Sequence, residues 1–392
     1  MSGQSRLKEL ENNIKLIIFI KMTAKPTSSI IHHFSSIEDP RVNRQKKHQL
    51  QDIFFISICA IICGADNWVA VEEFGVAKEE WFTEVLGLEN GIPSHDTFGD
   101  VYAAIDTEQF SICFSRWVAD LANITEGEVI AIDGKCLRRS IDKASKKAAI
   151  YMVSAWAQQN NLVLGQVKVD DKSNEITAIP KLLSRLDITG AVITIDAMGC
   201  QKKIAKQIKQ QGGDYVFSLK GNQGNLHDDV KTFFTSSLSP AVASVNYEGG
   251  HGRIETRSIR ATADIAWLQE RHDWSSLQSI IAVTAKREMG DKVTEETRYF
   301  ISSLDANDPK RLERVVRAHW AIENNLHWVL DVAFDEDSNR TRQGHSAANL
   351  AVIRHIALNL IKTEKTSKVG VKIKRLKAGW DNDYLLRILG VI

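Results

Sequence analysis

The stretches VIAID (Val129–Asp133) and VITID (Val192–Asp196) decide the fold of this chain. Each runs four apolar or small residues, most of them β-branched, into a single aspartate. Runs this short are typical of strands buried on both faces, in a sheet covered by helices. If the two strands are parallel neighbours, their equal lead-ins place Asp133 and Asp196 side by side at the rim of the sheet, where open α/β sheets place their sites.

The segments around these stretches predict a mixed α/β unit. The first strand is followed by the basic segment GKCLRRSIDKASKK and by the apolar runs IYMVSAWA and LVLGQVKV, which a polar QQNN turn joins as in a β-hairpin. EITAIPKLLSRL and QKKIAKQIKQ have the apolar spacing of helices, and DYVFSLK is a further strand. The order strand, hairpin, helix, strand, helix, strand predicts a mixed sheet with helices against it.

The chain ahead of this unit is predicted to be helical. QLQDIFFISICAIICGA is apolar nearly all round, Ser94 precedes HDTFGDVYAAI as an N-cap does, and FSICFSRWVADLANI is amphipathic. These helices serve either DNA contact or packing, and periodicity alone favours packing.

Length and composition set the class of the protein. A chain of 392 residues that is 43% hydrophobic is expected to fold as two or three domains. Its net charge of +1 means that affinity for nucleic acid has to come from a local basic face. Five cysteines with no CxxC pair indicate reduced thiols and no zinc site. The apolar run LIIFI is too short to span a bilayer, so we expect a cytoplasmic protein without membrane contact.

Two adjacent carboxylates repel each other unless a cation lies between them, so the repeated context favours a metal site. The alternative is that Asp133 and Asp196 each cap the turn that follows. The best segment for a third acid is PKRLERVVRAHWAIENNLHWVLDVAFDED, whose apolar residues predict a long helix with Glu323 on the shoulder of the buried stripe and His327 and Asp331 at steps of four. Glu323 and His327 also fit a plain stabilising pair. The rival third acids are Asp331, Asp335, Glu336 and Asp337.

Five phrases of the sequence resemble a known family: AIDGKCLRRS, KSNEITAIPKLL, ITIDAMGCQKKIA, YVFSLKGNQGNLHDDV and RAHWAIENNLHWVLDVAFDED. They look like those of the bacterial DDE insertion-sequence transposases of the ISAs type, the group of the H-repeat-associated proteins. The resemblance runs from HHFSSIEDPR to GWDNDYLLRIL. It implies a ribonuclease-H-like catalytic domain with Asp133, Asp196 and Glu323 as the metal-binding triad, and a β-rich insertion ahead of Glu323.

One departure from the wider family concerns hairpin chemistry. Related transposases often carry Tyr, Arg and Lys at fixed offsets around the catalytic glutamate, where this chain has Val316, His319 and Leu330. The family's Tyr, Arg and Lys bind a flipped or hairpinned DNA end, and this role is therefore not assigned to any residue of this chain.

The expected organisation follows from the patterns and the resemblance together. It consists of a variable N-terminal extension (1–30), a helical N-terminal domain and candidate DNA-binding region (31–124), a ribonuclease-H-like catalytic domain (125–221 and 298–361), a β-rich insertion (222–297) and a basic C-terminal tail (362–392).

The expected function is that of a DNA transposase, which cuts element ends by phosphodiester hydrolysis and joins the 3′ ends to target DNA. Two Mg²⁺ ions, with Mn²⁺ as a substitute, are expected about 3.5–4 Å apart. Asp133 would bridge both ions, while Asp196 and Glu323 would each hold one. The expected partners are double-stranded DNA, as element terminal inverted repeats and as target, and further copies of the chain in a homodimer or higher oligomer. On DNA the bacterial protein would be associated with the nucleoid.

Basic and aromatic residues near the proposed site are the candidate DNA contacts, although each also fits a solvated surface charge or a core aromatic. Positive side chains would position phosphates, and Trp320 would stack on a displaced base. The candidates are Lys135, Arg138, Arg139, Lys172, Lys220, Arg317, His319, Trp320 and His327.

Three other functions share parts of this pattern. A ribonuclease-H-like nuclease would cut without joining. A catalytically inactive, transposase-derived protein would bind DNA only. A metal-dependent phosphatase would use the same two aspartates on small phosphate esters and would show no salt-sensitive affinity for DNA.

Overall fold

The computed structural model describes residues 30–42, 46–141, 148–170, 173–236, 241–250 and 253–391. The expected N-terminal extension, with its LIIFI run, lies outside the described residues apart from Ile30. Within the described ranges, no helix is long and apolar enough to cross a membrane.

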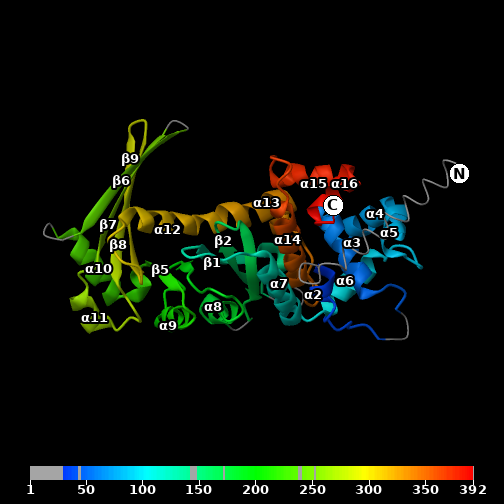
Figure 1. The fold of residues 1–392 in the computed structure, drawn as a ribbon, viewed down its shortest axis with the longest axis horizontal. Helices are drawn as coiled ribbons and strands as arrows, with labels where there is room; N and C mark the ends of the chain where they lie inside the picture. Colours follow the sequence, from blue (N-terminus) through cyan, green and yellow to red (C-terminus); the bar gives the residue numbers. More distant parts are fainter. Residues whose placement is uncertain are drawn as a thin grey trace.

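A mixed sheet runs through the described part of the molecule, with nine strands in the order β3-β2-β1-β4-β5-β9-β8-β7-β6 (Figure 1). In the first five, β1 pairs antiparallel with β2, β2 antiparallel with β3, and β1, β4 and β5 lie parallel to one another. This is the ribonuclease-H-like arrangement, and the predicted fold class is confirmed. The strands are β1 (Val129–Leu137), β2 (Ile150–Ala157), β3 (Leu162–Lys168), β4 (Val192–Ile195), β5 (Asp214–Leu219), β6 (Val242–Gly250), β7 (Arg253–Thr262), β8 (Ser279–Met289) and β9 (Lys292–Ser302).

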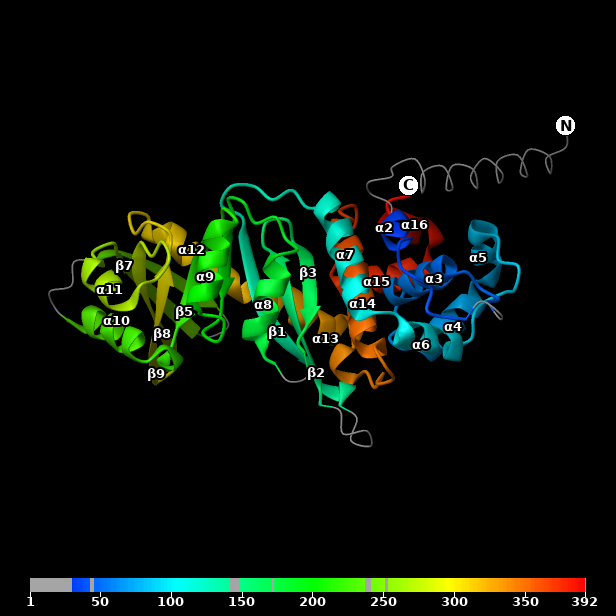
Figure 2. The same ribbon diagram turned by 90° about the horizontal axis from the view of Figure 1, so that it is seen from below.

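Helices cover both faces of the core strands, as the doubly buried runs require. Helices α8 (Glu175–Leu183) and α9 (Lys202–Gln210) lie on one face, and α12 (Pro309–Ile322) lies on the other (Figures 1 and 2). Side chains alternate between the faces of a strand. Valines at the starts of β1, β4 and β5 therefore pack together against the apolar stripe of α12, in a cluster that includes Val129, Val192, Val216, Leu312, Val315 and Val316.

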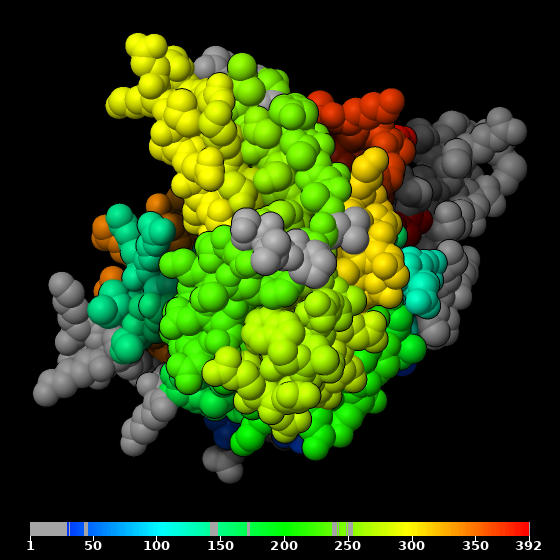
Figure 3. Space-filling model, turned by 90° about the vertical axis from the view of Figure 1, so that its left-hand side faces the viewer, coloured from blue at the N-terminus to red at the C-terminus, as the bar shows by residue number. Residues whose placement is uncertain are grey.

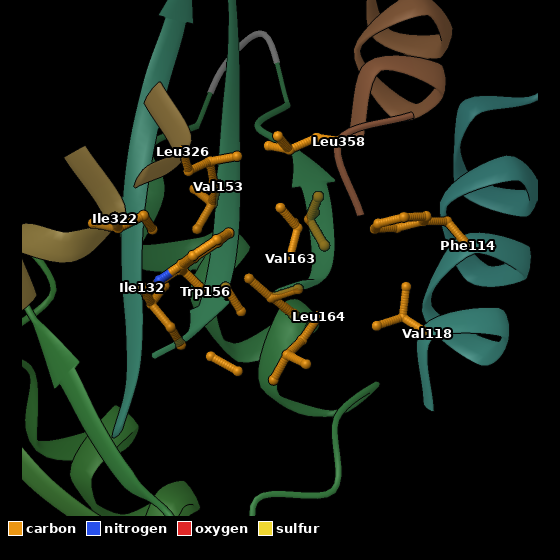
Figure 4. Close-up of a cluster of buried hydrophobic side chains, with 14 of the residues drawn as sticks. Phe114, Val118, Ile132, Val153, Trp156, Val163, Leu164, Ile322, Leu326 and Leu358 are labelled. Carbon is orange, nitrogen blue, oxygen red and sulfur yellow. The ribbon is translucent and has the colours of Figure 1, made fainter. Parts of the chain in front are cut away.

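The N-terminal region is helical, as predicted. Ser94 caps α6, because its side chain accepts a hydrogen bond from the backbone N–H of Thr97. Phe114 and Val118 of α7 lie opposite Val163 and Leu164 of β3, so helices and sheet share one core (Figure 4). The division at residue 124 stays a prediction. The helices are α2 (Ile30–Phe34), α3 (Leu50–Ile62), α4 (Trp68–Ala77), α5 (Glu79–Leu86), α6 (His95–Ala104) and α7 (Thr107–Leu121).

The segment between β5 and α12 is rich in strands, as the resemblance implied. It holds β6 to β9 with α10 (Asn225–Thr235) and α11 (Ala266–His272). Its last strand, β9, pairs antiparallel with β5 from Val216↔Ser302 to Leu219↔Tyr299, so the inserted strands continue the core sheet. Figure 3 looks at this end of the molecule and shows the yellow β8–β9 hairpin projecting from it.

The predicted basic C-terminal tail (362–392) is largely helical in the described residues. After α14 (Ser346–Thr363), it forms α15 (Val371–Trp380) and α16 (Asn382–Ile388). Lys374 and Arg375 are buried. Lys374 pairs with Glu364 at 3.1 Å, and Arg375 pairs with Asp66 at 2.9 Å. The charges of these two residues are therefore neutralised inside the protein.

Candidate active site

The two sequence-matched aspartates are brought together as predicted. Strands β1 and β4 are in register from Val129↔Val192 to Ile132↔Ile195, so the next residues of the two strands, Asp133 and Asp196, are neighbours. Asp196 Oδ1 also accepts hydrogen bonds from the backbone N–H groups of Met198 (3.0 Å) and Gly199 (3.2 Å). The turn-capping role is therefore real for Asp196, and it fixes this carboxylate at the rim of the sheet.

Glu323 reaches the site from α12, at a break in the helix. The sequence predicts one continuous α-helix, but a π-helical turn, Glu323–His327, separates α12 from α13 (Trp328–Phe334). A π turn accommodates an extra residue, and such turns are frequent at functional sites. On the buried side, Ile322 and Leu326 lie beside Ile132 and Val153 (Figure 4). Glu323 itself is exposed.

The charges around Asp133 are mostly of its own sign. The pKa of Asp133 is raised to about 7, mainly by burial and in addition by the carboxylates of Asp196, Glu175 and Glu323, against a backbone hydrogen bond that lowers it. The nearest ion-pair candidate is His327, with Nδ1 3.6 Å from Asp133 Oδ2. Burial lowers the pKa of His327 to about 4, so this ring is neutral at physiological pH and brings no positive charge.

The rival third acids have other partners. Asp331 and Glu336 both bind the ammonium group of Lys135, the latter at 2.7 Å. Asp337 lies 3.3 Å from Arg138. Asp335 ends α13 in the left-handed conformation, with a φ of 48°. Glu323 is the acid of this segment whose charge acts on Asp133, which favours it as the third member.

Two known protein families match the chain. One is described as DDE_Tnp_1-associated and matches residues 31–118; the other is the Transposase DDE domain, which matches residues 124–360, more than half of the chain. The chain belongs to the DDE transposase family. The resemblance of its motifs is thereby confirmed, and with it DNA binding and a divalent-metal-dependent transposase chemistry in general terms.

Relatives of similar length support the assignment. The transposase is 43% identical over 373 residues to "Putative transposase YncI" of Escherichia coli O157:H7, covering 92% of this chain and 94% of that one. It is 40% identical over 369 residues to "H repeat-associated putative transposase YhhI" of Escherichia coli K12, covering 92% and 97%. Among solved structures, a piggyBac transposase synaptic complex with hairpin DNA has 12% identity and a TM-score of 0.44, covering 95% of this chain and 80% of that one; a likeness this low does not bear on the assignment.

The donor set of the transposase suits a divalent ion, because carboxylate oxygens are the ligands that Mg²⁺ prefers. In the part of the chain that the structure describes, no three His, Cys, Asp or Glu side chains are already close enough to form a metal-binding group. Glu323 is exposed, and its charge acts on Asp133.

Three of the candidate DNA contacts are turned inward. Lys135 is 12% exposed and neutralised by Asp331 and Glu336. Although burial alone lowers the pKa of Lys135, these two carboxylates raise it overall. His319 Nδ1 lies 3.1 Å from Thr194 Oγ1, and burial lowers the pKa of His319, as it does that of His327. These three side chains are therefore mostly buried and contact other groups of the protein, and their assignment to DNA contact stays a prediction.

Other candidates are placed where DNA can reach them. Arg138, Arg139, Lys220 and Arg317 are exposed, as is Trp320, whose ring lies 5.1 Å from the guanidinium of Arg298. Lys172 lies outside the described residues.

A basic groove of about 980 Å³ lies between α12 and the inserted strands. Six arginines and two glutamates line it, which gives a net charge of +4, and Trp320, Asn324 and Asn325 extend it to the turn that carries Glu323. Because its arginines come from four different elements, no short motif predicts the groove. They are Arg257 of β7, Arg287 of β8, Arg298 of β9, and Arg311, Arg314 and Arg317 of α12.

The two glutamates of the groove orient its arginines. Glu255 is 4% exposed and pairs with Arg257 at 2.7 Å and Arg287 at 3.3 Å. Glu296 pairs with Arg298 at 2.9 Å; the arginine lowers the pKa of Glu296, and Lys220 adds to the effect, so Lys220 lies near the same groove.

Sequence reasoning also missed one carboxylate, Glu175, at the first residue of α8. Burial raises its pKa, and the charge of Asp196 raises it further. Its only signal in the sequence is its place in the KSNEI phrase, where it reads as an ordinary helix-start acid.

Proposed function

We propose that the transposase cuts the ends of its own DNA element and joins the freed 3′ ends to target DNA, with Asp133, Asp196 and Glu323 as the catalytic acids. The observation that carries the proposal is the set of like charges at the rim of β1 and β4, where neighbouring carboxylates raise the pKa of an already buried Asp133. Carboxylates held together without a fixed cation bind a divalent ion well, because the ion relieves their repulsion.

The proposed metal is Mg²⁺, with Mn²⁺ as a substitute, as two ions that Asp133, Asp196 and Glu323 would hold. Bound there, the ions would lower the pKa of water and neutralise charge on the phosphate. The protein positions the acids. Strand β1 fixes Asp133, the turn after β4 fixes Asp196 through two backbone N–H groups, and the π turn presents Glu323 from α12.

Strand transfer needs no covalent bond to the protein. Water first attacks a phosphorus atom at the element end, and the 3′ oxygen leaves. The 3′ hydroxyl then attacks a phosphorus atom of target DNA, so one P–O bond forms while another breaks. A serine or tyrosine nucleophile is therefore not required.

The basic groove supports the DNA-holding part of the proposal. One arginine guanidinium group can donate two hydrogen bonds to a phosphate group. The groove leads along α12 toward Glu323. We assign Arg138, Arg139, Lys220, Arg317 and Trp320 to DNA contact and include in the proposal that the transposase acts as a homodimer or higher oligomer.

The test is cleavage and joining of labelled DNA that carries the ends of the element, with Mg²⁺ or Mn²⁺. Asp133→Asn and Glu323→Gln should each reduce both products by at least about 10³-fold while DNA binding persists, because each removes an acid that acts only in the chemical step. The matched control is Glu80→Gln, an exposed glutamate in the first turn of α5, which should keep full activity.

The same assay separates the alternatives. Cutting without any joined product would indicate a nuclease, and binding without cutting by the natural chain would indicate a DNA-binding protein only. If Glu323→Gln retains activity and Asp331→Asn loses it, the third acid is Asp331. Sizing of the DNA complex by light scattering tests the oligomer, and a mass of one chain per complex would contradict it.

A further inference from the structure

Helix α15 buries one side and leaves the opposite side apolar and exposed. It packs against α13 and α14 at the upper edge of the molecule as drawn in Figure 1. On the buried side, Arg375 donates a hydrogen bond to the backbone carbonyl of Ala333, and its guanidinium carbon lies 4.2 Å from the centre of the Phe334 ring. A charged residue therefore fixes the helix to the rest of the protein, while the largest apolar side chains of the helix face outward.

The exposed side carries an apolar stripe, Ile373, Leu376 and Trp380, at spacings of three and four residues. At 3.6 residues per turn, these three side chains lie on one face of the helix. Val369, just ahead of the helix, is exposed as well, and Trp380 is 76% exposed. Monomeric proteins rarely gather several large apolar side chains at one place on the surface, so the stripe indicates contact with another macromolecule.

Charges of opposite sign lie at the two ends of the stripe. Lys368 and Lys372 are exposed at its N-terminal end, and Asp381 and Asp383 are exposed at its C-terminal end. In the part of the chain that the structure describes, none of these four side chains forms an ion pair. The surface is therefore apolar in the middle, positive at one end and negative at the other.

A second copy of α15, placed antiparallel, complements this pattern. A two-fold axis beside Leu376 sets Ile373 of one copy against Trp380 of the other, because the two positions are equally far from the axis. It also brings Lys372 of each copy to the acidic end of the other, where Asp381 and Asp383 lie. Each contact in a two-fold interface occurs twice, so one such surface is sufficient. DNA fits the surface less well, because its phosphates would meet the apolar middle and the acidic end.

We infer that the exposed face of α15 is the surface through which two copies of the transposase associate, antiparallel and about a two-fold axis. The inference rests on the proposed function in one respect: an element has two ends, and two copies bring one set of acids to each end. Tryptophan is enriched in the buried cores of protein interfaces, whereas lysine and aspartate belong to their rims, as they do in this arrangement.

The experiment is sedimentation equilibrium of the full chain over a range of concentrations, with and without DNA that carries an element end. The natural chain should sediment as a dimer. Trp380→Ala should raise the dissociation constant of the dimer by at least about 30-fold, an effect of the size found for a buried interface tryptophan. The control is Tyr247→Ala, which removes another exposed aromatic ring, from β6, and should leave the constant unchanged.

A charge exchange tests the orientation of the two helices without touching the apolar stripe. Lys372→Asp and Asp383→Lys should each weaken the dimer by about 5-fold, because each places like charges together. The double variant should regain most of the affinity. Both residues are exposed, so the Tm of each variant should match that of the natural chain. A double variant that dimerises more weakly than either single variant would overturn the antiparallel arrangement.

The outcomes keep this inference apart from the proposed function. If the natural chain is a dimer and Trp380→Ala is an equally strong one, the role of α15 is overturned and the proposed oligomer stands. If the natural chain is a monomer with and without DNA, both are overturned. If Trp380→Ala weakens DNA binding and leaves the dimer intact, α15 is a DNA contact and the inference is overturned. None of these measurements depends on cutting or joining, so the catalytic acids are tested separately.

Discussion

Two acid-rich regions lie next to each other in this transposase, and they differ in whether a cation is built in. At the rim of the sheet, the negative charges of Asp196, Glu175 and Glu323 all act on Asp133. A few residues further along, Asp331 and Glu336 surround the ammonium group of Lys135. The same kind of side chain therefore forms a candidate metal site in one place and part of the scaffold in the other.

The contrast is visible in opposite shifts of pKa. Burial and, to a smaller extent, the neighbouring carboxylates raise the pKa of Asp133 to about 7. Glu336 is buried even more completely, and burial alone would raise its pKa, yet Lys135 and Arg354 lower it overall. A cation fixed nearby therefore lowers the pKa of a buried carboxylate and keeps it charged, whereas burial beside other carboxylates raises the pKa.

Removing the cation from the group formed by Lys135, Asp331 and Glu336 should have the largest effect on stability. Lys135→Met leaves the buried Glu336 without its closest cation, so the free energy of unfolding should fall by about 3–5 kcal/mol. Urea unfolding measures it. The matched control is Arg138→Met, which removes an exposed cation 3.3 Å from Asp337 and should cost about 0–1 kcal/mol. Equal losses in the two variants would mean that Lys135 is not the structural partner described here.

Neutralising Asp133 at the rim of the sheet should instead stabilise the metal-free protein. Between pH 3.8 and about 7, folded Asp133 keeps a proton that the unfolded chain has lost, so the free energy of unfolding falls as pH rises through this window. Asp133→Asn removes this dependence and should stabilise the metal-free protein at pH 8 by on the order of 2–3 kcal/mol.

Urea unfolding at pH 5 and pH 8 in the presence of a chelator measures this effect. Asp291→Asn, an exposed acid in the β8–β9 turn, is the control and should leave the pH dependence intact. A natural chain that is more stable at pH 8 than at pH 5, by an amount that Asp133→Asn abolishes, would contradict the raised pKa of Asp133.

The smallest effect should come from Arg138, an exposed arginine beside Asp337. Arg138 is 77% exposed, so it can reach a phosphate, whereas Lys135 cannot. Arg138→Ala should weaken DNA binding a few-fold and reduce the slope of log affinity against log salt by about 0.9, the value for one lost phosphate contact. Fluorescence anisotropy at several salt concentrations measures the slope. An unchanged slope would remove Arg138 from the DNA contacts.

Local patterns predicted the strands and the adjacency of the first two acids correctly, because alternation and run length are properties of a short segment. They failed where a residue's role depends on a distant partner. Lys135 follows Asp133 in a basic segment and was predicted as a DNA contact, but its partners, Asp331 and Glu336, lie 196 and 201 positions away along the chain. Lys374 and Arg375 likewise belong to the predicted basic tail, but their partners Glu364 and Asp66 neutralise them inside the protein.

The sequence by itself determined the order of the core strands, the pairing of Asp133 with Asp196 and the family of the protein. Equal lead-ins to two parallel strands fix the register, and register fixes which side chains are neighbours. Only the tertiary structure decided which acids are neutralised, where α12 breaks into a π turn, and how arginines from four elements form one groove. The physical reason is that burial and electrostatic interactions depend on distance in space, which the spacing of residues along the chain does not specify.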